Sequence, residues 1–225
     1  PVAYAAWCLR IPHVILQMDL RPGLANRLMA PVSQALVSYF KRTANQFPSI
    51  SLKRKIGPVV RQEIFSANAE RANERFGLHP ERPLILITGG GQGAVGLNRA
   101  VLPLIKHLLS EYQVVHLTGT GSGNNLDQDS SFFSHPHYHP LEVVHEGMGD
   151  LLAISEIVLT RAGMGILGEL AFLQKDTVLI PLPGTHQEDN AKIIQENNAA
   201  EFVSQEVLAT MGIKWWNNFL ELRVP

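Results

Sequence analysis

The chain has a single cysteine, no apolar run long enough to cross a membrane and no excess of charge of either sign. One thiol cannot form an internal disulfide, so Cys8, in an apolar helical stretch, is expected to pack in the interior of a protein from a reducing compartment. Arg10 and Asp19 interrupt the longest apolar stretch before it reaches the ~18 residues of a membrane span, and nothing resembles a signal peptide. Because the 19 Lys and Arg residues are balanced by 20 Asp and Glu residues, we expect no nucleic-acid partner.

Short β-rich runs alternate with helical patterns from residue 83 onward, and this alternation indicates the fold class. Strands that are apolar on both faces and separated by helices predict an α/β protein with a doubly wound parallel sheet of Rossmann-like type. The expected strands cover residues 84–88, 113–119, 141–146, 157–160, 177–183 and 201–203. The expected helices cover residues 95–110, 149–155, 165–173 and 190–198.

The first part of the chain repeats this pattern less regularly, and charge density rises around Gly57 and Pro58, which predict a linker. Its helical pattern starts at Pro1 without a preceding strand, so we expect the chain to be a piece of a longer protein. The expected units are a partial first Rossmann-like domain, a linker with a helix and a complete second domain, over residues 1–56, 57–82 and 83–225.

The stretch from Gly89 to Gly96 places five glycines between an expected strand and an expected helix. Glycine permits close backbone approach, and the first turn of a helix presents unpaired N–H groups at the positive end of its dipole, so the stretch favours a phosphate. The pattern G-x-G-x-x-G also occurs in NAD-binding domains, but here the second strand ends in Thr118 and Gly119, without the usual acidic residue. We therefore expect neither a nicotinamide nor a flavin cofactor, and a tight turn without ligand is the structural alternative.

A second glycine turn, RAGMGILGEL, follows an expected strand. Gly163 and Gly165 open a helix, and Glu169 lies one turn inside it. Two such helix starts in one domain predict a ligand with more than one anionic group, such as a diphosphate. Glu169 either complements the helix dipole or accepts hydrogen bonds from ribose hydroxyls, and the residues alone leave both interpretations open.

The third polar loop, residues 181–191, ends a strand with a Pro/Gly turn and then presents His186 and Gln187. The amide of Gln187 both donates and accepts hydrogen bonds, which suits sugar hydroxyls, while Asp189 and Asn190 are typical helix caps. Because the carboxyl ends of parallel strands meet at one edge, we expect five loops around one crevice. These loops are residues 89–96, 118–125, 145–149, 161–165 and 182–189.

Two further stretches bear on metals and on domain contacts. His135, His137 and His139 invite a zinc site, but their alternate spacing and the proline between the first two favour a surface loop, so we expect no bound metal. The stretch WWNNFLEL near the carboxyl end predicts an amphipathic helix that docks on the other domain.

Four motifs, GGGQGAVGLN, TRAGMGILGE, IPLP and HQEDNA, resemble in order and spacing the donor domain of the MurG family of bacterial glycosyltransferases. PGLANRLMAP and GPVVR are similar to family stretches upstream, so the likeness covers most of the chain. The resemblance implies a GT-B fold and an inverting, metal-independent transfer of N-acetylglucosamine from UDP-N-acetylglucosamine to lipid I, a lipid-linked acceptor in peptidoglycan synthesis. It also implies a cytoplasmic enzyme at the inner face of the plasma membrane, with membrane contact through the N-terminal domain.

The resemblance also implies which residues bind substrate. The glycine loop would meet the diphosphate, the backbone of His145 would pair with uracil, and Glu169 would hold the ribose. Residues 164–167 would line the sugar and phosphates, Gln187 would contact the sugar, and Arg61 would approach from the linker. The full set comprises Arg61, Gly91, Gln92, Gly93, His145, Met164, Gly165, Ile166, Leu167, Gly168, Glu169, His186 and Gln187.

Departures from the family pattern concern the phosphates and the acceptor. Gly91 replaces the usual serine, which removes a hydrogen bond worth ~0.5–1.5 kcal/mol. The acceptor motif His-Glu-Gln-Asn is replaced by a stretch ending in Asp19, the acceptor-side candidate, and the interdomain Gly-Asn-Pro-Val-Arg is replaced by GPVVR. The catalytic base is expected in a segment outside this sequence, so the chain alone should bind donor without transferring sugar. The alternatives are a nucleotide-sugar-binding subunit of a split transferase and a UDP-N-acetylglucosamine 2-epimerase.

Overall fold

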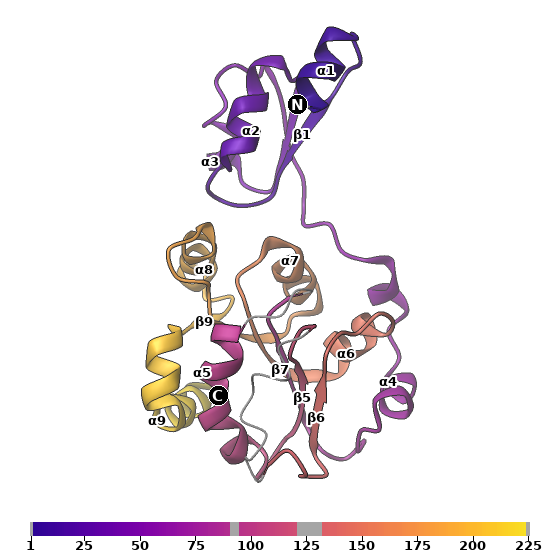
Figure 1. Ribbon diagram of the computed structural model, residues 1–225, viewed down its shortest axis with the longest axis vertical. Helices are drawn as coiled ribbons and strands as arrows, with labels where there is room; N and C mark the ends of the chain where they lie inside the picture. Colours follow the sequence, from indigo (N-terminus) through magenta and orange to yellow (C-terminus); the bar gives the residue numbers. More distant parts are fainter. Residues whose placement is uncertain (1, 91–94, 121–131, 224–225) are drawn as a thin grey trace.

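The computed structural model describes residues 2–90, 95–120 and 132–223, which form two parallel β-sheets (Figure 1). The smaller sheet has three strands in the order β1-β2-β3, and the larger has six in the order β6-β5-β4-β7-β8-β9. The chain progresses outward on both sides of the β4–β7 pair, which is the arrangement that creates a ligand crevice at the carboxyl ends of the strands. The predicted α/β class with a doubly wound parallel sheet is confirmed.

The smaller unit is formed by the first part of the chain, drawn in indigo and violet at the top of Figure 1. Its strands are β1 (Val14–Gln17), β2 (Ala35–Ser38) and β3 (Leu52–Lys55). Its helices are α1 (Val2–Cys8), α2 (Leu24–Met29), the 3-10 helix η1 (Ala30–Val32) and α3 (Lys41–Ala44). Ile15, Leu36 and Phe47 are buried at its centre.

Cys8 is exposed, so its predicted packing role is wrong, because α1 turns Ala3 toward the interior instead.

The segment after β3 runs from the smaller unit to the far side of the larger one. It contains the 3-10 helix η2 (Gln62–Ser66) and helix α4 (Ala69–Phe76). Helix α4 ends at Gly77, whose φ of 63° is a left-handed conformation that glycine adopts without strain. Arg71 of α4 donates from Nε to the buried Asp150 at 2.7 Å, and this pairing lowers the pKa of Asp150. The carboxylate thereby fastens the connecting segment to the larger unit.

The larger unit holds the long helices and the six-stranded sheet. Its strands are β4 (Leu84–Thr88), β5 (Gln113–Leu117), β6 (Tyr138–Leu141), β7 (Ser155–Thr160), β8 (Asp176–Leu179) and β9 (Glu201–Phe202). Its helices are α5 (Val95–Leu108), α6 (Met148–Ile154), α7 (Met164–Leu173), α8 (His186–Glu196) and α9 (Gln205–Arg223). All residues of β4 and β5 are buried, as central strands of a parallel sheet covered on both faces require.

Helices cover both faces of the larger sheet (Figure 1). Helices α5 and α9 pack together on one face, where Leu104 and Trp216 join the apolar core. Helices α6 and α7 contribute Leu151 and Leu170 to the core on the other face. The predicted terminal helix is present as α9, and its docking on the other domain, expected of an intact enzyme, stays a prediction. Trp216 is 1% exposed and packs edge-on against Tyr112, so the helix closes the core of its own unit.

The edge strand β6 lies earlier in the chain than expected. The predicted strand over residues 141–146 is wrong beyond Leu141, because the chain leaves the sheet there. The predicted surface loop is wrong for Tyr138 and His139, which belong to the strand. Tyr138 anchors it, since this side chain is 4% exposed and its ring lies 5.4 Å from that of Phe132.

Candidate functional site

A cavity of about 410 Å³ lies at the carboxyl ends of the central strands, where the crevice was predicted. Thr88 ends β4 and Leu117 ends β5, and the starts of α6 and α7 complete the wall. Its lining comprises Arg61, Thr88, Gly90, Leu117, Glu142, Val143, Val144, Met148, Gly163, Gly165 and Ile166. Three of the five expected loops therefore meet here, residues 182–189 do not line the cavity, and most of 118–125 lies outside the described residues.

The backbone at the start of α7 is open toward this cavity. A Cβ atom at Gly163 or Gly165 would meet no heavy atom within 4 Å, and the same holds for Gly90, whose φ is 91°. The first turn of α7 has no acidic side chain, so no carboxylate competes for its free N–H groups. This surface suits an anion. Gly91 to Gly93, predicted to contact the diphosphate, lie outside the described residues.

Arg61 brings a positive charge to the cavity wall from the connecting segment. Its Nε donates to Glu169 Oε1 at 2.6 Å, and its Nη1 donates to Glu63 Oε1 at 3.3 Å. Burial, the largest single effect, opposes the charged form, but the hydrogen bonds and negative charges of Glu169 and Glu63 together outweigh it, so the pKa of Arg61 is raised. Glu63 also accepts a hydrogen bond from the backbone N–H of Gly149 at 3.1 Å. The guanidinium group is thus held between α6 and α7.

Glu169 is a buried carboxylate one turn inside α7. Its side chain is 7% exposed, and Oε1 is occupied by Arg61. Its other oxygen, Oε2, is buried without a hydrogen-bond partner among the described residues. The structure therefore adds a third role, orientation of Arg61, to the two that the sequence left open. A buried acceptor without a partner lowers stability, which makes Oε2 a candidate acceptor for a ligand hydroxyl.

The remaining predicted residues of α7 point in two directions. Gly165 and Ile166 line the cavity. Met164 and Leu167 are buried in a cluster that includes Tyr39 of the smaller unit. A Cβ atom at Gly168 would lie 2.6 Å from Cβ of Pro58, so the connecting segment crosses the helix in contact with this residue.

We expect Gly168→Ala to lower the free energy of unfolding by about 1–2 kcal/mol, although alanine ordinarily favours a helix. The reason is the short approach of Pro58, a rigid residue that the new methyl group must displace. Gly165→Ala in the same helix is the matched control, because its Cβ atom would meet nothing within 4 Å. Denaturant unfolding of both variants measures the difference, and equal effects would contradict the assigned contact.

Asn190 joins the start of α8 to the smaller unit. Its Oδ1 accepts a hydrogen bond from Leu20 N at 3.1 Å, and its Nδ2 donates to Asp19 Oδ1 at 3.0 Å and to Ala162 O at 3.1 Å. The predicted role of Asn190 as a helix cap is therefore wrong, since its amide bonds the smaller unit and the carbonyl group of Ala162 within its own unit, and Thr185 caps the helix. Asp19, the acceptor-side candidate, lies at this joint.

His186 and Gln187, two further residues of the predicted substrate-binding set, are the first residues of α8. Thr185 caps the helix by accepting a hydrogen bond from Gln187 N at 3.3 Å, which is why α8 begins four residues earlier than the predicted residue 190. His186 Nε2 lies 3.6 Å from Asp19 Oδ1. Gln187 Oε1 accepts from Leu182 N at 3.1 Å, and this bond orders the turn before the helix.

His145 is exposed and does not line the cavity, whereas its neighbours Val143 and Val144 do. Neither valine was predicted to line the site, because two adjacent β-branched residues suggest a continuing strand. Gly147 was the feature of the sequence that could have identified this segment as a loop. It precedes α6 with a φ of 83°, and a glycine just before a helix indicates a loop rather than a strand.

A buried chain of polar groups that no sequence motif predicts connects α5 to the sheet. Asn98 of α5 donates from Nδ2 to Thr118 O at 2.8 Å, so its Oδ1 accepts from His116 Nε2 at 3.1 Å. His116 Nδ1 is then the acceptor for Tyr138 Oη at 2.9 Å. Burial lowers the pKa of His116 to about 4. These bonds fix α5, the helix that follows the glycine loop, to β5 and β6.

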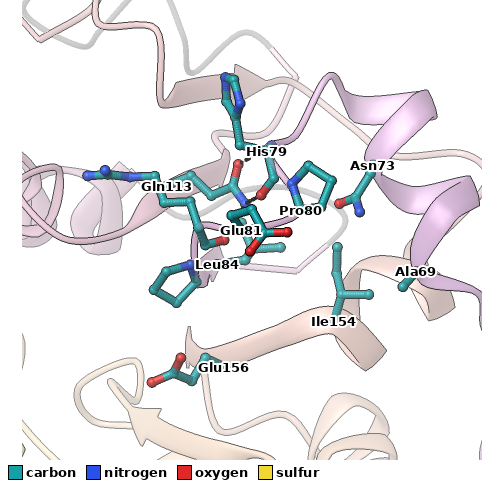
Figure 2. Close-up of a pocket in the computed structure, with 11 residues that line it drawn as sticks. Ala69, Asn73, His79, Pro80, Glu81, Leu84, Gln113, Ile154 and Glu156 are labelled. Atoms are coloured by element: carbon teal, nitrogen blue, oxygen red, sulfur yellow. Dashed lines mark hydrogen bonds between the residues drawn. The ribbon is translucent and has the colours of Figure 1, made fainter.

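A second cavity lies at the opposite edge of the larger sheet, where β4 and β5 begin (Figure 2). Figure 2 shows Gln113 turned toward His79. Gln113 Oε1 accepts from His79 N and Nε2 donates to His79 O, both at 2.9 Å. These polar groups hold the connecting segment on the sheet, and the edge is the one away from the strand ends where ligands gather in this fold.

Within residues 2–90, 95–120 and 132–223, no group of three or more His, Cys, Asp or Glu side chains is arranged to hold a metal ion. The ring of His137 lies 5.0 Å from that of His79, and desolvation lowers the pKa of both His137 and His139. None of the helices in these ranges combines the length and apolar character of a membrane span.

Known proteins similar to the chain include glycosyltransferases. Residues 84–214 match the model of the glycosyltransferase family 28 C-terminal domain. A curated relative from Lachnoclostridium phytofermentans, the UDP-N-acetylglucosamine–N-acetylmuramyl-(pentapeptide) pyrophosphoryl-undecaprenol N-acetylglucosamine transferase, is 34% identical over 216 residues, which are 93% of this chain and 58% of that protein.

Two solved structures are similar over nearly the whole chain. MurG from Acinetobacter baumannii has a TM-score of 0.67 at 25% identity, covering 97% of this chain and 62% of that one. A UDP-N-acetylglucosamine 2-epimerase from Neisseria meningitidis, bound to UDP-N-acetylglucosamine, has a TM-score of 0.69 at 18% identity, covering 94% of this chain and 63% of that one. The second likeness is one of fold alone.

Proposed function

The chain belongs to glycosyltransferase family 28, and from this membership we propose that it binds UDP-N-acetylglucosamine at the cavity beside β4. We further propose that it serves the transfer of N-acetylglucosamine to a lipid-linked acceptor, the reaction named for its curated relative. The chain spans 58% of that relative's length, so the activity of the whole protein is part of the proposal. Identity of 34% to a transferase, against 18% to an epimerase, supports transfer over epimerisation.

One observation carries the proposal for the donor. The open glycine backbone at the start of α7 and the guanidinium group of Arg61 line the same cavity. Helix N–H groups and a cation together stabilise a diphosphate, both when it is bound and when it leaves with negative charge developing on it. Such a leaving-group site operates without a metal ion, as the metal-independent mechanism requires.

The other donor contacts are arranged around this anion site in the proposal. Oε2 of Glu169 accepts the ribose hydroxyls, and the backbone of His145 pairs with uracil. Gln187, with His186 beside it, reads the sugar hydroxyls from the start of α8. The diphosphate contacts fall on Gly91, Gln92 and Gly93.

The acceptor side completes the proposed reaction. A base outside this sequence deprotonates the acceptor hydroxyl, which displaces UDP at the anomeric carbon with inversion. Asp19 lies at the joint between the two units, and in the proposal the acceptor binds on its side. We place the enzyme in the cytoplasm at the inner face of the plasma membrane, where a lipid-linked acceptor is reached by contact of the smaller unit with the bilayer.

Isothermal calorimetry on this chain tests the proposal. We expect UDP and UDP-N-acetylglucosamine to bind with affinities that a chelator does not change, and NAD to bind more weakly. Glycine-rich turns serve both ligand classes, so NAD is the matched competitor. Tighter binding of NAD than of UDP would refute the assigned donor.

A further inference from the structure

Arg161 is a buried cation that the proposed donor contacts do not use. It follows β7 directly and is 6% exposed. Its Nη1 donates to Ile180 O at 2.8 Å and to Pro181 O at 3.0 Å, and its Nη2 donates to Gln205 Oε1 at 2.5 Å. These partners are neutral, and burial lowers the pKa of Arg161. Arg161 has no acidic partner among the described residues, and burying a charge without one costs stability.

Gln205 lies between Arg161 and the first turn of α5. It begins α9, the helix that packs along α5. Gly96 is the second residue of α5, and a Cβ atom there would lie 2.6 Å from Gln205 Oε1, the atom that accepts from Arg161. The missing side chain of Gly96 therefore leaves room for the amide of Gln205, which lies against the start of the helix.

Arg161 and Gln205 thus connect segments at the carboxyl edge of the larger sheet. Arg161 opens the turn before α7, and the carbonyl groups of Ile180 and Pro181, to which it donates, begin the turn before α8. Gln205, which also accepts from Arg161, lies against the start of α5. One guanidinium group therefore bonds the turn before α8 and the side chain that packs on the start of α5.

We propose that Arg161 and Gln205 are positioning residues for the donor diphosphate. They hold the starts of α5 and α7 at the separation that two linked phosphates require, an inference that rests on the proposed function. The buried positive charge of Arg161 adds to the field that favours an anion at this edge. Binding of the diphosphate then offsets part of the cost of burying the cation.

A double-mutant cycle between Gly96 and Gln205 tests the inference, with UDP and uridine as calorimetric probes. Gly96→Ala forces the Gln205 amide away from its position and should lower UDP affinity about tenfold. Gln205→Ala should cause the same loss, and adding Gly96→Ala to it should cause no further loss. Uridine affinity should stay unchanged throughout, because uridine carries no phosphate. Glu206→Gln, at the next residue of α9, is the matched control and should bind UDP as the wild type does.

Each result decides for or against the inference. Arg161→Lys keeps the positive charge but removes the guanidinium group that bonds both carbonyl groups and Gln205. It should lower UDP affinity as much as Gln205→Ala does. Additive losses in the double variant, or equal losses for UDP and uridine, would overturn the assignment. A lower midpoint of thermal unfolding with an unchanged ratio of UDP to uridine affinity would show that Arg161 and Gln205 have a structural role alone. Failure of the wild type to bind UDP would refute the proposed function as well, whereas UDP binding with additive losses would refute the positioning role alone.

Discussion

Lowering the pH from 7 to 4 is expected to reduce the free energy of unfolding by about 3 kcal/mol through His116 alone. Its pKa is about 4 in the fold, against 6.5 ordinarily, because burial disfavours the imidazolium ion. Between pH 6.5 and pH 4, His116 binds a proton in the unfolded chain but stays neutral in the folded chain. Stability therefore rises with pH across this window and is lost as pH falls from 6.5 toward 4. Urea unfolding measured at steps of pH gives the curve.

The difference between wild type and His116→Gln isolates this contribution, since the other titrating groups are common to both. The variant should be less stable at pH 7, where Tyr138 Oη loses its acceptor, and its curve should be flatter below pH 6.5. His107→Gln, at a half-buried histidine of α5 that bonds Asn217, is the matched control. Parallel curves for wild type and His116→Gln would show that burial does not hold this imidazole neutral.

Glu169→Gln is expected to lower UDP affinity about ten- to hundred-fold, because a hydrogen bond to a charged acceptor is worth ~1.5–3 kcal/mol. The buried Oε2 atom has no partner among the described residues, and in the proposed function it accepts the ribose hydroxyls. Calorimetry with UDP and 2′,3′-dideoxy-UDP separates this role from support of Arg61. The wild type should prefer UDP, and the variant should bind both nucleotides equally.

Glu63→Gln is the matched control for Glu169, since both carboxylates bond the same guanidinium group. If Glu169 acts only through Arg61, the two variants should weaken UDP binding alike and keep the preference for UDP over the dideoxy nucleotide. That outcome would return Glu169 to an orienting role. Loss of the preference in Glu169→Gln alone would assign the ribose to it.

The sequence predicted those parts of the fold in which local pattern and tertiary position agree. The apolar runs that became β4 and β5 are buried on both faces, and the glycines before α7 do line a cavity. Strand β6 was misplaced because His139 and Pro140 are poor strand formers. Its position is set by Tyr138, which packs against Phe132 and bonds His116, and neither contact is visible in local sequence.

The candidate site was less predictable than the sheet, because several of its residues have roles that depend on distant partners. Gly168 resembles a ligand-facing glycine in sequence, yet the atom that meets it is Pro58, more than a hundred positions away. Asn190 resembles a helix cap, yet its amide bonds Leu20 and Asp19. No periodicity or motif reports such contacts, since they arise from the way the two units meet.

The burial of Trp216 in the larger unit also has a consequence for biosynthesis. The residues of β4 leave the ribosome long before those of α9, so the apolar core on the α5 side of the sheet stays incomplete until the chain has been made as far as Trp216 and Phe219. Domains generally fold as units, and exposed apolar surface makes unfinished ones prone to aggregation. The larger unit therefore completes its core only when translation reaches α9.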